Sequence, residues 1–249
     1  MQDCVYEKII KLEKQFSSNN YNGSSKSQFT TKEGSVPIMI SAPHAVNHYR
    51  RGNIKYADMF TGTIAEYIHR VTGCHAIYSS MYTQSDPNYD DLNSNAYQQE
   101  LIGYIKENNI YTVLDIHGAA AHRGYAIQRG VPHVPNKSTY LDYENVDSII
   151  YRIFEKHFRY STLVKKEIDR NYEFGTTGQN TVTKCLSENT NAICIQLEIN
   201  RVFRNQDNKL AFTCMLSALE ELIPMILKYK EYGMHLYDSL EVCLWKVFM

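Results

Sequence analysis

Three polar residues stand at or just beyond the ends of three apolar runs that read as β-strands. His44 follows "VPIMISAP", His117 lies in "TVLDIHG", and Glu198 lies in "AICIQLEINR". Burial of an unpaired polar group costs about 1–3 kcal/mol, so each of these side chains needs a partner. Parallel strands bring such residues together at one edge of a sheet. Two imidazoles and carboxylates at one edge are the ligands of a catalytic zinc, which keeps one position open for water.

Neighbouring residues support this interpretation. Asp115 lies two positions before His117 and shares its strand face, so its carboxylate is placed to orient the imidazole as an outer partner of the metal site. Gly118 follows and lets backbone or substrate approach. Each residue alone also has a simpler explanation: a histidine at a strand end is more often a hydrogen-bonded structural residue, and Glu198 is within reach of Arg201 or Arg204. The combination of residues carries the metal hypothesis.

The elements that must position these residues alternate along the chain. Helical spacing of apolar residues predicts helices over 5–16, 59–72, 96–109, 144–158 and 210–232. Gly73 is the expected C-terminal cap of the second helix. Apolar and β-branched runs predict strands over 36–42, 75–81, 110–118 and 191–201. This alternation predicts an α/β sheet with helices on both faces and a ligand site at the C-terminal ends of its strands.

Composition narrows the function classes. The chain has 249 residues, 43% of them hydrophobic, and is expected to form one domain over 1–249. A net charge of −1 gives no general electrostatic reason to bind nucleic acid or an anionic membrane. No window approaches a membrane span of about 20 apolar residues. The six scattered cysteines and an acid-containing N-terminus without a long apolar run predict free thiols, no signal peptide and a cytoplasmic location.

Four segments resemble the successive blocks of one enzyme family. "PIMISAPHA", "ADMFTGTIAEYI", "LDIHGAA" and above all "IQLEINRVFRN" are similar to the N-formylglutamate amidohydrolase family, which is related to the zinc carboxypeptidases and aminoacylases. The resemblance covers about residues 37–227 in the right order. It implies a three-layer α/β/α sandwich with a mixed, mostly parallel sheet. It also implies metal-dependent hydrolysis of a C–N amide bond.

The resemblance implies His44, Asp58 and His117 as ligands of one Zn²⁺ per chain. In carboxypeptidases a Glu ligand follows the first histidine after three positions, where this chain has Asn47. Asp58 instead matches the place of an acidic residue in the amidohydrolase family, and its alternative role is that of a helix N-cap. His48 would bind only if a helical turn began at once, and "HYRRGNI" reads as a loop. Mn, Fe, Co or Ni are alternative metals for this ligand set.

The remaining residues complete a hydrolase hypothesis. Glu198 acts as general base and then general acid. Arg201 or Arg123 holds a substrate carboxylate, and His122 is a further candidate for substrate contact. Asn93 lies where the family often has an Asp-x-Asn-Arg substrate loop, and this chain has Ser94 in place of the arginine. The expected substrate is a small acidic N-acyl amino acid such as N-formylglutamate. A γ-glutamyl or other peptide hydrolase, or a catalytically silent binding protein on the same scaffold, are the alternatives.

Overall fold

A computed structural model describes residues 2–132, 137–158, 167–171 and 180–233 of the chain. Its elements follow in this order: α1 (Gln2–Ser17), β1 (Phe29–Lys32), β2 (Val36–Ala42), β3 (His48–Arg50), β4 (Asn53–Lys55), α2 (Thr61–Thr72), β5 (Cys74–Ser79), η1 (Leu92–Ser94), α3 (Ala96–Glu107), β6 (Thr112–Ala119), β7 (Tyr125–Gly130), α4 (Lys137–Phe158), β8 (Glu167–Asn171), α5 (Val182–Asn189), β9 (Ile193–Asn200), η3 (Arg201–Arg204) and α6 (Lys209–Tyr232).

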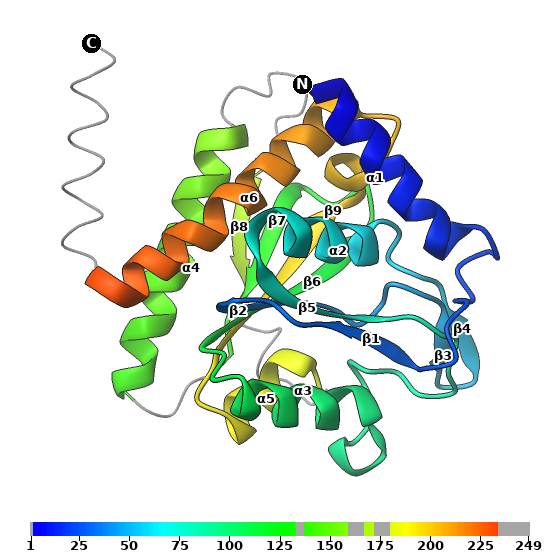
Figure 1. Ribbon diagram of the computed structural model, residues 1–249, viewed down its shortest axis with the longest axis horizontal. Helices are drawn as coiled ribbons and strands as arrows, with labels where there is room; N and C mark the ends of the chain where they lie inside the picture. Colours follow the sequence, from blue (N-terminus) through cyan, green and yellow to red (C-terminus); the bar gives the residue numbers. More distant parts are fainter. Residues whose placement is uncertain (1, 133–136, 159–166, 172–179, 234–249) are drawn as a thin grey trace.

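A mixed sheet of seven strands, in the order β1-β5-β2-β6-β9-β7-β8, forms the centre of the fold. Four neighbouring pairs are parallel, and two pairs, β1 with β5 and β7 with β9, are antiparallel. Helices α1, α2, α4 and α6 lie on one side of this sheet, and α3 and α5 lie on the other (Figure 1). The three-layer α/β/α sandwich with a mixed, mostly parallel sheet is therefore confirmed.

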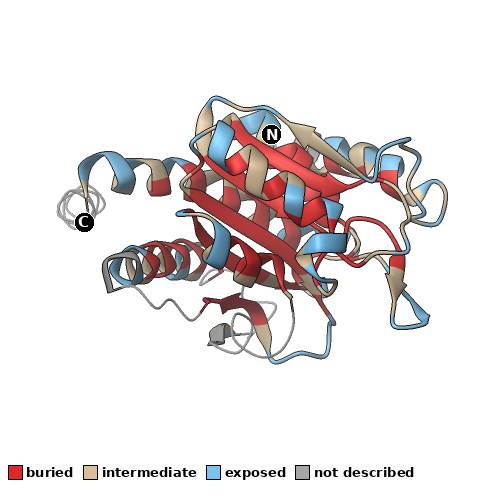
Figure 2. Ribbon diagram, turned by 90° about the horizontal axis from the view of Figure 1, so that it is seen from below, coloured by how far each residue is buried: buried red, intermediate tan, exposed pale blue. Residues whose placement is uncertain are grey.

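Period-two alternation explains why both faces of the central strands are covered. In β2, Ile38 and Ile40 enter the apolar cluster beneath α2, α4 and α6, whereas Met39 enters the cluster beneath α3 and α5. The same alternation recurs in β6, where Leu114 and Val113 face opposite sides. Figure 2 shows the resulting core, with the sheet buried between the helices.

The structure adds elements that the sequence did not predict. The strands β1, β7 and β8 and the helix α5 have at most eight residues each, which is too short for a clear periodic signal. Helix α4 begins seven residues before the predicted start at 144. The segment "HYRRGNI", predicted to be a loop, instead forms the antiparallel hairpin β3–β4.

Helix α6 contradicts the expectation that no segment is apolar and long enough to span a membrane. By length and composition alone it is long and apolar enough to cross a membrane. Half of its most apolar window is buried within the protein, and it packs against α4, α2 and η3. That packing is what a core helix of a globular domain shows.

Cys74, Cys185, Cys194 and Cys214 are free thiols, as predicted.

Candidate metal centre

Three rungs of side chains cross the sheet face that α3 and α5 cover. The first rung is apolar and packs beneath these helices: Met39, Val113 and Cys194. The second rung, two residues further along each strand, is polar: Ser41, Asp115 and Gln196. The third rung pairs His117 of β6 with Glu198 of β9. The predicted convergence of β2, β6 and β9 is therefore present, because these strands are parallel neighbours whose C-terminal ends share one edge.

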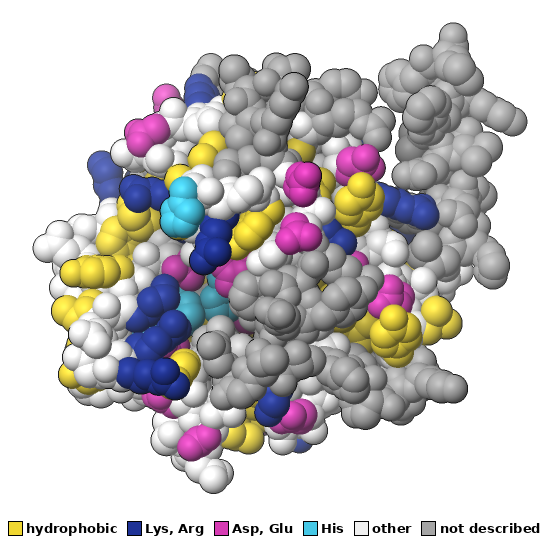
Figure 3. Space-filling model, turned by 180° about the vertical axis from the view of Figure 1, so that it is seen from behind, with side chains coloured by type: hydrophobic (Ala, Val, Ile, Leu, Met, Phe, Trp, Pro, Cys, Tyr) yellow, Lys and Arg dark blue, Asp and Glu magenta, His cyan; other side chains and the backbone are white. Residues whose placement is uncertain are grey.

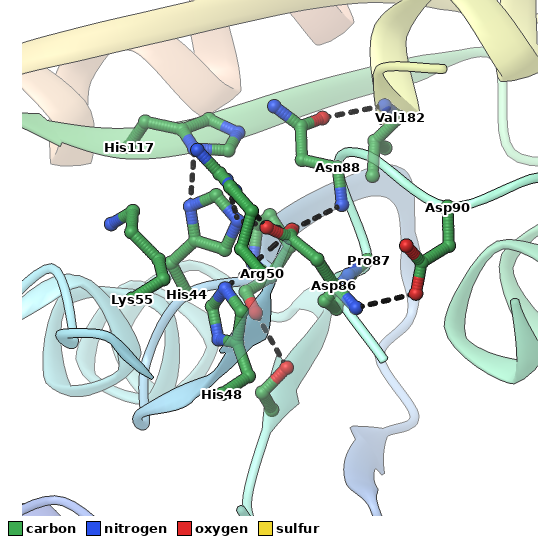
Figure 4. Close-up of polar contacts among 12 residues, drawn as sticks. His44, His48, Arg50, Lys55, Asp86, Pro87, Asn88, Asp90, His117 and Val182 are labelled. Atoms are coloured by element: carbon green, nitrogen blue, oxygen red, sulfur yellow. Dashed lines mark hydrogen bonds and ion pairs between the residues drawn. The ribbon is translucent and has the colours of Figure 1, made fainter. Parts of the chain in front are cut away.

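Three donor atoms meet at this edge from three different segments. His44 Nδ1 lies 3.2 Å from His117 Nδ1 and 3.3 Å from the Oδ2 atom of Asp58. His117 Nδ1 lies 3.8 Å from the same Asp58 oxygen. All three side chains are buried. The three residues named from sequence thus form one compact N, N, O cluster (Figure 4 shows its two histidines).

A buried carboxylate holds the far nitrogen of each histidine. His117 Nε2 lies 2.9 Å from Asp115, whose other oxygen accepts a hydrogen bond from Ser41. His44 Nε2 lies 3.0 Å from Asp86, which comes from the loop after β5. Carboxylate partners of this kind fix the orientation of a metal-binding imidazole. Both rings therefore direct their Nδ1 atoms toward Asp58, and the prediction that Asp115 orients His117 fits this geometry.

The hairpin β3–β4 returns the chain so that Asp58 lies beside His44. Its base closes through a hydrogen bond from the backbone N–H of Asp58 to the carbonyl of His44, 2.8 Å away. Asp58 is not the N-cap of α2, because that position belongs to Phe60, which makes no side-chain cap hydrogen bond. Instead, Asp58 Oδ1 accepts from Lys55 at 2.8 Å, and Oδ2 accepts from the Gly118 N–H at 3.0 Å. Its side chain therefore faces the histidines.

Burial and neighbouring charges set the ionisation of the cluster. Burial, reinforced by the ammonium of Lys55, lowers the pKa of His44 to about 4. Burial also opposes protonation of His117, but the carboxylate of Asp115 and those of Glu198 and Asp58 raise its pKa to about 9. The Nδ1 atoms of the two rings lie within hydrogen-bonding distance, 3.2 Å apart. For Asp58, burial favours the neutral form, but Lys55 and the two histidines hold its pKa well below the usual range.

These donors fit a transition metal in chemistry and in spacing. Zinc bonds of about 2.0–2.2 Å at tetrahedral angles place neighbouring ligand atoms roughly 3.3–3.6 Å apart. The three donor separations, 3.2, 3.3 and 3.8 Å, bracket that spacing. A cation bound between them would also offset the close approach of the two Nδ1 atoms, 3.2 Å apart. His44, Asp58 and His117 are therefore the residues that would hold it, with imidazole and carboxylate as suitable zinc ligands.

A second cluster shares His44 through its other nitrogen. It consists of His44, His48 and Asp86, all buried. His48 Nδ1 lies 3.2 Å from the Val46 carbonyl, and its Nε2 lies 3.5 Å from Asp86. A guanidinium already occupies this cluster, because Arg50 pairs with Asp86 and the Nη2 atom of Arg50 lies 3.4 Å from His44 Nε2 (Figure 4). The cluster at His44 Nδ1 is therefore the better metal site.

Glu198 lies beside this centre and is partly buried. It stands opposite His117 across the parallel β6–β9 pair and opposite Gln128 on β7. Gln196 donates a hydrogen bond of 2.9 Å to its Oε1 atom. Burial and the charge of Asp58 raise the pKa of its carboxyl, although His117 acts in the opposite direction. A carboxyl with a raised pKa next to a metal site suits proton transfer.

The residues predicted to bind substrate all lie at the surface. Arg201, Arg123, Asn93 and His122 are exposed, and their roles in binding stay predictions. The cations that contact the buried centre are instead Arg50, on Asp86, and Lys55, on Asp58. Figure 3 shows Lys and Arg side chains gathered beside histidine and acidic side chains on this face of the molecule.

Sequence reasoning missed Asp86, Arg50 and Lys55 as parts of the centre. Asp86 sits in the polar loop "SDPNYDD", and its Oδ1 also accepts from the Asn88 N–H two residues on, as an ordinary turn aspartate does. Arg50 and Lys55 belong to the unpredicted hairpin. The only available signal was the density of ionisable residues over 44–58, which contains two histidines, two arginines, a lysine and an aspartate.

A cavity of about 610 Å³ lies elsewhere, at the opposite edge of the sheet. Its walls include Ile110 and Tyr111 before β6, and Ala192 before β9. These residues precede the strands whose other ends carry His117 and Glu198. This cavity is therefore separate from the metal centre.

No protein-family model matches the chain, and no curated protein matches it. Solved structures resemble it in fold. A bacteriophage poly-gamma-glutamate hydrolase is 13% identical with a TM-score of 0.44, over 85% of this chain and 93% of that one. A metallo-carboxypeptidase from Burkholderia cenocepacia is 9% identical with a TM-score of 0.45, over 88% and 68%. The CwlD amidase from Clostridioides difficile, in complex with the GerS lipoprotein, is 14% identical with a TM-score of 0.45, over 78% and 99%.

Proposed function

We propose that this protein is a metal-dependent hydrolase that cleaves an amide bond. The observation that carries the proposal is the convergence of His44 Nδ1, His117 Nδ1 and Asp58 Oδ2, with each histidine held from behind by a carboxylate. Two imidazoles and a carboxylate that converge, with an outer carboxylate on each imidazole, match the way in which proteins hold a catalytic metal. Zinc is the metal that this ligand set suits best, with one ion per chain.

The chain's own residues supply the remaining chemistry. Zinc bound at these donors would lower the pKa of a coordinated water and polarise the scissile carbonyl. Glu198 accepts a proton from the attacking water and passes it to the leaving nitrogen as the C–N bond breaks. Water thereby adds its hydroxyl to the acyl carbon and its proton to the amine. Asp115 and Asp86 keep the two imidazoles in place throughout.

The substrate in this proposal is a small N-acyl amino acid with an acidic part. Lys55 and Arg50 lie directly against the centre, and Arg51 stacks on the Tyr89 ring beside them, 4.3 Å from its centroid. Lys55 and Arg50 are already paired with Asp58 and Asp86, so Arg51 is the hairpin cation that we propose attracts a substrate carboxylate. N-formylglutamate is the specific substrate that the sequence blocks suggest, and a γ-glutamyl peptide is its alternative. A cytoplasmic location and action without nucleic acid or membrane complete the proposal.

Hydrolysis assays on a matched substrate panel test this function. The zinc-loaded protein is incubated with N-formylglutamate, N-acetylglutamate, a γ-glutamyl dipeptide and N-formylleucine, and release of the free amine is followed. We expect hydrolysis of at least one acidic substrate, lower kcat/KM for N-formylleucine, and loss of turnover when zinc is removed. No amine release from any member by the zinc-loaded protein would contradict the hydrolase proposal and favour a catalytically silent binding protein.

A further inference from the structure

Arg204, the last residue of η3, is buried and joins three segments of the metal centre. Its Nε donates to the carbonyl of Ile199 at 3.0 Å, near the end of β9. Its Nη2 donates to the carbonyl of Ala119 at 3.2 Å, at the end of β6. Its Nη1 donates to the carbonyl of Met59 at 2.7 Å, in the turn that follows Asp58. One rigid guanidinium thus connects the three segments that contain Glu198, His117 and Asp58.

Gly118 makes room for this arginine. A Cβ atom at position 118 would lie 2.3 Å from Arg204 Nη2 and 2.5 Å from its Cζ. The guanidinium cannot move aside without losing its carbonyl partners. The same glycine donates its N–H to Asp58 Oδ2 at 3.0 Å. The close approach anticipated for Gly118 is therefore made by an arginine side chain.

We propose that Arg204 is a positioning residue that sets the spacing of the metal ligands, by tying the Asp58 turn to the ends of β6 and β9. Its planar fork offers fixed donor directions that a lysine ammonium cannot reproduce. The expected effect on metal affinity rests on the proposed function, whereas the expected effect on the backbone around Arg204 rests on its hydrogen bonds alone. Arg204 need not contact metal or substrate for this role.

Arg129 provides a matched control. It is also a buried arginine near the end of a strand, with its Nε and Nη2 on Asp147 of α4 and its Nη1 on the carbonyl of Asp169. It ties β7 and β8 to α4, on the far side of β9 from His117. Arg204→Lys and Arg129→Lys each break up a set of three hydrogen bonds from a buried guanidinium while keeping the charge, although two of the Arg129 bonds go to a carboxylate. Only the first disturbs the segments that carry the ligands.

Two measurements on the full chain test the proposal. The first is the dissociation constant for zinc, obtained by competition with a chromophoric chelator, together with the visible spectrum of the cobalt-loaded protein. We expect Arg204→Lys to weaken zinc binding by about 10–100-fold, as loss of outer partners of a metal site does, and to alter the cobalt spectrum. Gly118→Ala keeps the arginine in the sequence but places a methyl group where its guanidinium lies, so this variant should act in the same direction. Arg129→Lys should leave both readouts unchanged.

The second measurement is amide hydrogen exchange of the metal-free proteins. In Arg204→Lys the peptides over 56–62 and 116–120 should exchange faster, whereas Arg129→Lys should leave them unchanged. Unaltered exchange there would overturn the proposal, whether or not zinc binds. A wild-type protein that binds no metal would instead remove the proposed function, and exchange would still decide the role of Arg204. If Arg204→Lys and Gly118→Ala both failed to fold while Arg129→Lys folded, Arg204 would be a determinant of the whole fold. That result would also overturn the proposal.

Discussion

The backbone N–H of Asp58 donates to the carbonyl of His44, 2.8 Å away, although fourteen positions separate the two residues. The hairpin β3–β4 between them makes this contact possible, because its two short strands return the chain to its starting point. The carboxylate of Asp58 therefore lies beside the imidazole of His44, with 3.3 Å between Oδ2 and Nδ1. Asn47 holds the loop instead: its Nδ2 donates to the Asn20 carbonyl, and its Oδ1 accepts from the Ala57 N–H.

Asp58→Asn tests the carboxylate of the centre. The amide keeps the shape of the side chain but loses the charge that faces the two histidines, so zinc affinity should fall by more than about 100-fold, beyond the loss typical of an outer partner. Isothermal titration of the metal-free protein with zinc measures this change. Asp147→Asn, which alters a buried aspartate paired with Arg129, should bind zinc like the wild type. Equal loss in both variants would point to a general effect of buried charge.

Glu198→Gln separates chemistry from metal binding. The amide cannot accept a proton from water, so kcat should fall by about 10²–10⁴-fold while zinc content stays at the wild-type level. Steady-state rates on the best acidic substrate, with elemental analysis of the same samples, provide the comparison. A variant that turns over at the wild-type rate would remove Glu198 from the reaction.

Asp115→Asn examines the orientation of His117. Loss of the carboxylate that faces His117 Nε2 should weaken zinc binding by about 10–100-fold. Ser41→Ala removes only the hydroxyl that donates to Asp115 at 2.8 Å, so its effect should be smaller. Chelator competition on both variants ranks them. If Ser41→Ala weakened zinc binding more than Asp115→Asn, the effect of Asp115 would come from its contacts in the protein core and not from its contact with the imidazole of His117.

The ion pair between α4 and α6 gives a prediction about pH and stability. Hydrogen bonds from His157 and Lys156 lower the pKa of Glu221 to about 2. Because this folded pKa lies below the ordinary 4.5, the stabilisation is complete above about pH 4.5 and is lost as the pH falls toward 2. Glu221→Gln should therefore lower the free energy of unfolding by roughly 1–2 kcal/mol at pH 7, allowing for partial exposure.

Urea unfolding at pH 7, 4.5 and about 2.5 follows this difference. It should be constant between the first two values and shrink at the third. Glu188→Gln, at an exposed pair with Lys184 on α5, serves as the control and should change stability little at any of these pH values. A deficit in Glu221→Gln that persists unchanged at the lowest pH would show that the side chain stabilises by packing.

The sequence was sufficient for the parts of the fold and site that local patterns determine. Long apolar runs predicted β2, β6 and β9, and parallel pairing then placed His44, His117 and Glu198 at one edge. Period-two alternation put Asp115 on the same face as His117. What local patterns cannot show is pairing between distant segments. The contact of Arg50 with Asp86 spans 36 positions, and the bonds of Arg204 to Met59 and Ala119 span 145 and 85, so neither has a signature in the sequence.

Local patterns also do not show which of two nearby arginines is buried. Arg201, which closes the "QLEINR" block, is exposed at the start of η3, and its role in substrate binding stays a prediction. Its neighbour Arg204, three positions further on, is the buried one. Which of two nearby arginines turns inward depends on the carbonyls that each can reach, and this depends on the tertiary fold.

Metal content tests the central claim most directly. The protein is purified without added metal and without a polyhistidine tag, beside a His44→Ala, His117→Ala double variant and a His75→Ala control, which changes a buried histidine outside the centre. Elemental analysis should find about one zinc per chain in the wild type and the control, and none in the double variant. No metal in any sample after dialysis against zinc, or equal metal in all three, would contradict a metal centre at His44, Asp58 and His117.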